Sequence, residues 1–328
     1  RMVNVASTLS KASKELEHNP RNECTRERPT QECEGYPFPP LPSHISSDDI
    51  IDFYVSSLSN EKNIACTLYR SSGPHNVYVE NLGLRINASK PVIVICHGFK
   101  SWRNQMLLAH LGGGLTSEMN CHTLRFDFTG NGHSSGTFRL SNYDEEYLDL
   151  KAIVSFIQEK MKCRVPCIIG HSKGAACVLR YATEQEKERH ALRIPCFVNL
   201  SGRYFTPFTY DVSRILNEDQ ISELRTCGKT IIDKKGSREF VVTMDDIQEI
   251  NSLNSDYVLQ IKSSRVMTLH GSKDTQVDLS NAYQFENKIR NHKLVVIDGG
   301  DHNYNGLRHI RRLVDSISSF IISVESDG

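Results

Sequence analysis

The chain has 328 residues, and its 39 lysines and arginines are balanced by 39 aspartates and glutamates. This length suits one α/β domain of roughly 250 residues together with an insertion and a tail. The absence of net charge removes any case from composition for binding nucleic acid or an anionic membrane surface, and it is compatible with a neutral small-molecule substrate.

The N-terminal residues 1–45 are polar, charged and proline-bearing, which is typical of an arm rather than a folded domain. No apolar run approaches the roughly 20 residues of a membrane span, and the first residues lack the apolar stretch of a secretory signal. Glu15 and Glu17 come too early for a convincing transit peptide, so organellar import is the weaker alternative. These features predict a cytoplasmic protein.

From residue 50 onward the sequence predicts strands that alternate with helices. The expected strands are 50–57, 63–70, 91–96, 123–128, 165–169, 196–200, 265–270 and 293–297. Such alternation is typical of a mostly parallel, doubly wound sheet with helices on both faces. The fold class predicted is therefore α/β.

A long stretch follows the sixth expected strand and is too long for a simple crossover. The sequence therefore predicts a cap at 203–262, inserted between core segments 46–202 and 263–328. Within the cap we expect a helix over 211–224, a hairpin of 230–233 with 239–242, and a second helix that begins at a capping box of Thr243 and Asp246. Because the cap leaves the carboxyl edge of the sheet, it is expected to cover the active site.

The most informative motif is the pentapeptide of residues 170–174, Gly-His-Ser-Lys-Gly, between an apolar strand and a helix-favouring segment. Strand, tight turn and helix in that order form a nucleophile elbow, which projects a serine hydroxyl above the sheet. The flanking glycines are needed because side chains there would collide with the neighbouring strand and helix. Ser172 is therefore the candidate nucleophile.

Two later strands end in residues that could activate this serine. Asp274 follows the strand at 265–270, and His302 follows the strand at 293–297. Imidazole can remove the serine proton near neutral pH, and a carboxylate can hold the imidazole in the required tautomer. Asp278 and Asp301 are alternative acids, but Asp301 adjoins the histidine and Asp278 lies deeper in the following helix. We therefore predict a triad of Ser172, Asp274 and His302.

The loop after the strand at 91–96 contains His97, Gly98 and Phe99. A hydrolase needs N–H donors for a developing oxyanion, typically one after the nucleophile and one from this loop. The predicted donors are the backbone N–H groups of Lys173 and Phe99, with an ordinary turn as the alternative reading of the loop. The Lys173 side chain is expected to be solvated or structural.

Aromatic residues gather where the cap begins and after the oxyanion loop. They could form an apolar or aromatic acyl pocket, or they could simply pack the cap onto the core. The sequence leaves both readings open for Trp102, Tyr204, Phe205, Phe208 and Tyr210.

The chain has 10 cysteines, and several of them fall within expected core elements. Reduced thiols are predicted for Cys96, Cys167, Cys177 and Cys196, because buried free cysteine behaves as a small hydrophobe. Cys163 and Cys167 lack the second ligand pair of a zinc site. No metal and no cofactor are expected.

The motifs together resemble the α/β-hydrolase superfamily, in particular its serine aminopeptidase-like family and the plant branch related to feruloyl and cinnamoyl esterases. The resemblance spans about residues 50–322 and rests on residues 96–99, 125–132, 170–174, 198–204, 270–274 and 291–294. It implies an α/β-hydrolase fold with the same triad. It implies no particular substrate, because the family includes peptidases, esterases and thioesterases.

The leading functional prediction is a cofactor-independent serine esterase acting on a small apolar or aromatic molecule. The same triad could serve an aminopeptidase, an amidase or an acyltransferase. An aminopeptidase would require acidic cap residues to hold the substrate ammonium, for which Glu218, Asp219 and Glu223 are available. The alternative of a different class is a noncatalytic ligand-binding protein with this fold. The only partner expected is a small-molecule substrate, with no nucleic acid and no membrane.

Overall fold

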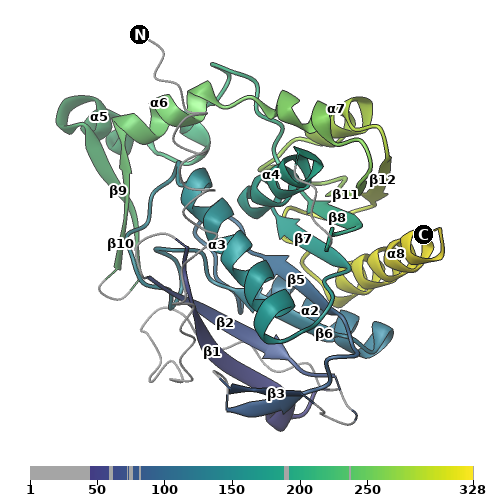
Figure 1. Cartoon of the computed structure of the whole chain (residues 1–328). Helices are drawn as coiled ribbons and strands as arrows, with labels where there is room; N and C mark the ends of the chain where they lie inside the picture. The colour runs from purple at the N-terminus through teal and green to yellow at the C-terminus, as the bar shows by residue number, and fades with distance from the viewer. Residues whose placement is uncertain are drawn as a thin grey trace.

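The computed structural model describes residues 45–58, 62–71, 73, 77–80, 83–187, 192–235 and 238–327 (Figure 1). The predicted N-terminal arm lies almost entirely outside these residues. A short 3-10 helix, η2 (Ser47–Asp49), leads into the first strand.

The fold is built on one eight-stranded sheet in the order β1-β2-β6-β5-β7-β8-β11-β12. The first two strands pair antiparallel, β2 pairs antiparallel with β6, and the remaining neighbours are parallel. The strands are β1 (Ile50–Ser56), β2 (Asn63–Tyr69), β5 (Val92–Cys96), β6 (His122–Phe126), β7 (Cys167–His171), β8 (Cys196–Leu200), β11 (Arg265–Gly271) and β12 (His292–Ile297). Every strand predicted for the sheet is present, with ends that differ by up to two residues.

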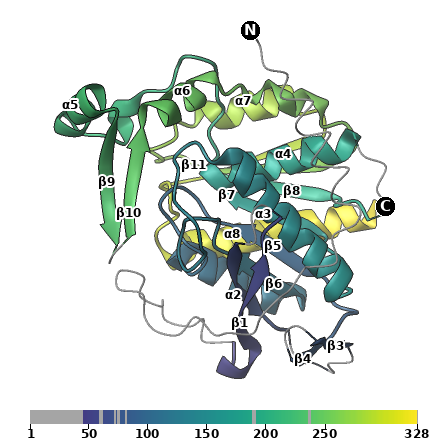
Figure 2. The ribbon, with the colours of Figure 1, turned by 60° about the vertical axis from the view of Figure 1, so that its left-hand side comes forward.

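Helices cover both faces of the sheet, as Figure 2 shows. On one face lie α2 (Met106–Met119) and α8 (Leu307–Ser326). The other face carries α3 (Tyr143–Ser155) with its π-helical extension η4 (Phe156–Lys160), α4 (Lys173–Lys187) and α7 (Ser280–Lys288). Alternate residues of β5 feed the two cores, with Val94 in one and Ile93 and Ile95 in the other. This two-sided burial explains the continuous apolar runs of the central strands.

A short hairpin that the sequence analysis did not predict consists of β3 (Val77–Val79) and β4 (Leu84–Ile86). Its strands have only three residues each. Segments this short carry little of the period-two pattern by which a strand is recognised.

The chain between β8 and β11 forms the structure that was expected to be a cap. It contains η5 (Val212–Arg214), α5 (Glu218–Cys227), β9 (Lys229–Lys235), β10 (Arg238–Thr243), α6 (Met244–Ser252) and η6 (Ser255–Gln260). The predicted hairpin is present, and α6 begins at the predicted capping box. The expectation of one helix over 211–224 is wrong, because a 3-10 turn comes first and Asn217 then caps α5.

The inserted segment packs onto the loops above the sheet through its own apolar cluster. The ring of Phe240 in β10 lies 4.8 Å from that of Phe138, measured between centroids. Asp233 in β9 forms an ion pair of 2.9 Å with Lys100, which follows β5. These contacts hold the β9–β10 hairpin beside the carboxyl edge of the sheet. The division into core and cap domains stays a prediction.

The eight cysteines within the described residues are all free, and seven of them are buried. They include the four that were predicted to be reduced. Across the same residues, no group of three or more His, Cys, Asp or Glu side chains is placed to hold a metal ion. None of the described helices is both long and apolar enough to cross a membrane.

Candidate active site

Ser172 lies at the sharp turn between β7 and α4, with a backbone φ of +53° that non-glycine residues seldom adopt. A Cβ added to Gly174 would lie 2.3 Å from the His97 carbonyl oxygen, and one added to Gly170 would lie 2.5 Å from the Gly174 carbonyl oxygen. Both approaches are too close for any side chain. The collisions expected from the motif therefore follow from the structure, and they leave the half-buried Ser172 at the tip of the turn.

The three predicted triad residues lie within hydrogen-bonding distance of one another. His302 Nε2 is 3.0 Å from Ser172 Oγ, and His302 Nδ1 is 2.7 Å from Asp274 Oδ2. Asp274 follows β11 and His302 follows β12, so parallel strands bring their loops to the same sheet edge. The alternative acids make other contacts, since Asp278 accepts from the Ser280 N–H and Asp301 accepts from Asn305.

Asp274 is held as a carboxylate by several donors. Its Oδ1 accepts the backbone N–H groups of Gln276 and Val277, each at 2.9 Å. Burial by itself would raise its pKa, but hydrogen bonds from His270, His302 and Val277 outweigh burial and hold the pKa of Asp274 well below its usual range. An ionised Asp274 must accept from His302 Nδ1–H, which leaves Nε2 free of a proton and able to accept one from Ser172.

His171, just before the nucleophile, positions the histidine of the triad. Its Nε2 lies 2.8 Å from the backbone oxygen of His302, so this nitrogen carries a proton and donates it to that carbonyl. Complete burial lowers the pKa of His171 from 6.5 to about 3, which keeps the ring neutral. One end of the elbow thus fixes the loop that carries His302.

The predicted oxyanion loop lies against the nucleophile. A Cβ on Gly98 would be 3.0 Å from the Cβ of Ser172. His97 Nε2 accepts the Phe128 N–H at 3.0 Å, so its Nδ1 carries the proton and donates to the Gly98 carbonyl at 2.8 Å. Burial lowers the pKa of His97, which favours this neutral form. The imidazole of His97 therefore holds the peptide group that contains the Phe99 N–H.

The other predicted donor belongs to Lys173, the first residue of α4, whose N–H has no partner in its own helix. The Lys173 side chain is structural rather than solvated: it is buried and forms an ion pair with Glu146 of α3. Its ammonium also lies 4.6 Å from the centroid of the Tyr143 ring. The lysine thereby ties the elbow to α3.

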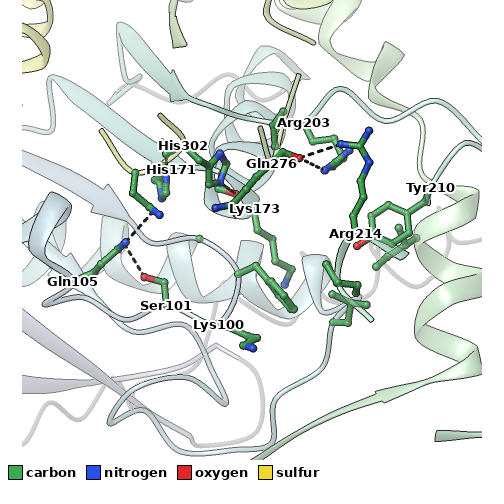
Figure 3. Close-up of a pocket in the computed structure, with 18 of the residues that line it drawn as sticks. Lys100, Ser101, Gln105, His171, Lys173, Arg203, Tyr210, Arg214, Gln276 and His302 are labelled. Atoms are coloured by element: carbon green, nitrogen blue, oxygen red, sulfur yellow. Dashed lines mark hydrogen bonds between the residues drawn. The ribbon is translucent and has the colours of Figure 1, made fainter. Parts of the chain in front are cut away.

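A pocket of about 550 Å³ opens beside Ser172 and His302 (Figure 3). Three of the five aromatic residues predicted for the pocket line it, namely Trp102, Phe205 and Tyr210, and Phe99 joins them. The other two lie elsewhere. Tyr204 packs against Phe285 and donates to Asp256, and Phe208 is 87% exposed.

The charged side chains among the described lining residues are basic. Lys100, Arg203, Arg214 and Lys235 line the pocket together with the buried Lys173, and no aspartate or glutamate is among the described lining residues. The three acidic cap residues that an aminopeptidase was expected to use, Glu218, Asp219 and Glu223, are exposed and lie outside the lining.

Comparisons with known proteins agree with this architecture. Residues 87–218 match the family described as serine aminopeptidase, S33. The structure of Est1E from Butyrivibrio proteoclasticus with ferulic acid bound is 18% identical, with a TM-score of 0.59 over 81% of this chain and 97% of that one. The Pyrococcus furiosus esterase Pf2001 is 18% identical, with a TM-score of 0.60 over 89% of this chain and 99% of that one. Mouse alpha/beta hydrolase domain-containing protein 10 is also 18% identical, with a TM-score of 0.55 over 81% of this chain and 96% of that one.

The chain has the α/β-hydrolase fold. A search of curated protein sequences found no match. The expected fold class is therefore confirmed, including an insertion after the sixth strand of the main sheet.

Within this α/β-hydrolase fold, the sequence analysis missed the residues that support the site. Asp127 accepts the Arg103 backbone N–H at 2.5 Å and pairs with its guanidinium, which anchors the chain just after the oxyanion loop. Glu146 and His171 support the elbow from α3 and β7. These roles depend on contacts between distant segments. The available local signal was the position of Asp127 near the end of the expected strand 123–128 and before a glycine-rich loop.

Proposed function

We propose that the protein is a serine hydrolase that cleaves a carboxylic ester of a small molecule through an acyl-enzyme on Ser172. The observation that carries the proposal is the hydrogen-bonded series Asp274, His302 and Ser172 at the edge of an open pocket. A nucleophile, a base and an orienting acid in this arrangement suit acyl transfer. The names of similar structures agree, since the Pyrococcus protein is called an esterase.

In this mechanism His302 Nε2 takes the proton of Ser172 as Oγ attacks the substrate carbonyl. The carbonyl oxygen becomes an oxyanion that accepts from the N–H groups of Lys173 and Phe99. His302 then gives the proton to the leaving alcohol, and the acyl group stays on Ser172. A water molecule, deprotonated by the same imidazole, releases the acid and restores the serine.

The aromatic side chains of Phe99, Trp102, Phe205 and Tyr210 support a substrate with an apolar or aromatic body. Amide hydrolysis and acyl transfer to an alcohol use the same triad. An aminopeptidase is the less favoured alternative, because the described lining offers no carboxylate for the substrate ammonium. A noncatalytic binding role would leave the aligned triad without a purpose. The plant branch of the family and the cytoplasmic location stay predictions from sequence.

The proposal is tested by intact-mass measurement after exposure to a fluorophosphonate, together with turnover of para-nitrophenyl esters. Wild type should gain one adduct and hydrolyse the esters. Ser172→Ala should do neither while it melts like wild type, and Ser326→Ala, at the exposed end of α8, should behave like wild type. Undiminished ester turnover by Ser172→Ala would refute the mechanism.

A further inference from the structure

Two arginines from the start of the inserted segment converge on the loop that carries the triad acid. Arg203 Nη2 donates to the backbone oxygen of Gln276 at 3.0 Å, and Arg214 Nη1 donates to the same oxygen at 3.3 Å (Figure 3). Gln276 lies two residues after Asp274. All three labelled side chains lie on the wall of the pocket that contains Ser172. This pair of cations is therefore part of the same cavity as the nucleophile.

Neither guanidinium has a carboxylate within ion-pair distance among the described residues. Asp211 and Asp278 interact with Arg214 only from beyond ion-pair distance, and their hydrogen bonds come from other groups: Asp211 accepts from the N–H and hydroxyl of Ser213, and Asp278 accepts from the Ser280 N–H. A guanidinium has five N–H donors, and the shared carbonyl occupies one from each arginine. Several charged donors thus remain on each side chain.

The surroundings of Arg203 make the lack of a counter-ion costly. Burial lowers its pKa most, and repulsion from Arg214 contributes to the lowering. An arginine nonetheless keeps its charge at every working pH, so the two like charges persist side by side. A bound anion would relieve this repulsion and use the remaining donors in bidentate hydrogen bonds.

The rest of the lining reinforces the sign of the charge. Asp233, which is not a lining residue, pairs with Lys100, and Lys235 donates to the backbone oxygen of Lys100 at 3.0 Å. Lys173 is neutralised by Glu146. The charged lining residues of the described pocket are thus all cationic, and its positive balance comes from the arginine pair, although the whole chain has no net charge.

We propose that the substrate of this pocket bears a carboxylate, separate from the ester that is cleaved, which binds the pair Arg203 and Arg214. The inference rests on the proposed esterase function and narrows its substrate class to monoanionic esters. The carboxylate is present before and after attack on the carbonyl, so the pair holds ground state and transition state alike. Binding of the carboxylate by the arginine pair should therefore lower KM more than it raises kcat.

The test compares each anionic ester with its own methyl ester. Mono-para-nitrophenyl glutarate places the carboxylate on the acyl side, and 4-acetoxybenzoate places it on the leaving side. Wild type should favour the anionic member of at least one pair by about 10- to 100-fold in kcat/KM, which corresponds to about one charged hydrogen bond. Arg203→Gln and Arg214→Gln should each remove most of that preference through KM. Arg225→Gln, an exposed arginine of α5 outside the pocket lining, should retain it.

The outcomes separate the inference from the function on which it rests. Hydrolysis of the methyl esters as fast as the anionic ones would overturn the inference and leave the esterase intact. A preference that survives in both arginine variants would overturn it as well. If no ester is turned over, the esterase proposal fails, and calorimetry then measures how tightly Ser172→Ala binds the anionic ester and its methyl ester. Tighter binding of the anionic ester would support the arginine site. Equal binding of the two esters would refute that site as well.

Discussion

The buried ion pair of Lys173, the residue after the nucleophile, allows its effect on stability to be tested separately from its effect on activity. Lys173 and Glu146 form a pair whose side chains are only 5% and 3% exposed. Removing one partner leaves the other charge buried and alone, which costs about 3–5 kcal/mol in proteins. We therefore expect Lys173→Met and Glu146→Gln each to lower the free energy of unfolding by about that amount. The double variant Lys173→Met with Glu146→Leu should recover most of the loss, because no unpaired charge remains.

Activity should respond differently from stability. Lys173→Met keeps the backbone N–H that is assigned to the oxyanion, so kcat of the folded variant should fall by less than about tenfold. By comparison, removal of an oxyanion donor lowers kcat by about 10²–10³-fold. Urea unfolding at neutral pH and ester turnover at a temperature where all variants are folded measure the two effects. A hundredfold loss of kcat in folded Lys173→Met, or single-variant losses that simply add in the double variant, would refute this reasoning.

Two further predictions concern stability. Burial lowers the pKa of His292 from 6.5 to about 4, so its contribution is complete above pH 6.5 and is lost as the pH falls towards 4. Urea titrations between pH 4 and 6.5 give the slope of the unfolding free energy against pH. In His292→Gln this slope should be flatter than in wild type by up to about 1.4 kcal/mol per pH unit. An unchanged slope would contradict a neutral His292. Arg103→Met strands the buried Asp127 and should cost about 3–5 kcal/mol. Arg125→Met should cost less than Arg103→Met, because it strands no carboxylate: the buried Arg125 guanidinium lies 4.0 Å from the centroid of the Tyr69 ring, and its nitrogens have no hydrogen-bond partner in the described part of the chain. Equal losses in thermal melts would disprove this contrast.

The elements that a single segment determines could be predicted from sequence. Ser172 stands in a pentapeptide whose glycines and flanking strand and helix are all local signals. Asp274 and His302 each follow an apolar run, and parallel strands bring such loops to one edge. The placement of these three side chains therefore follows from strand order, before any tertiary contact is known.

The inserted segment was less predictable because its local signals compete. Residues 211–224 contain enough helix-favouring residues to suggest one helix, but Asn217 accepts the Gln220 N–H and starts a new helix in the middle of the stretch. Tyr204 and Phe208 show a second limit. Their aromatic character indicates burial or binding, but the Tyr204 ring turns to Phe285 and Asp256, which lie far along the chain, and the Phe208 ring is exposed.

Charge shows why composition says little about the field inside a pocket. A balance of 39 cations and 39 anions is compatible with a neutral ligand. Ion pairs, however, are distributed by tertiary contacts: Glu146 and Asp233 each neutralise one lysine, while Arg203 and Arg214 donate to a neutral carbonyl and form no ion pair among the described residues. Since the field inside a cavity depends on charges within a few ångströms, the carboxylates elsewhere on the surface do little to cancel it. A chain with no net charge can therefore present a cationic pocket, and the two arginines next to the Asp274 loop are where that field should select the substrate.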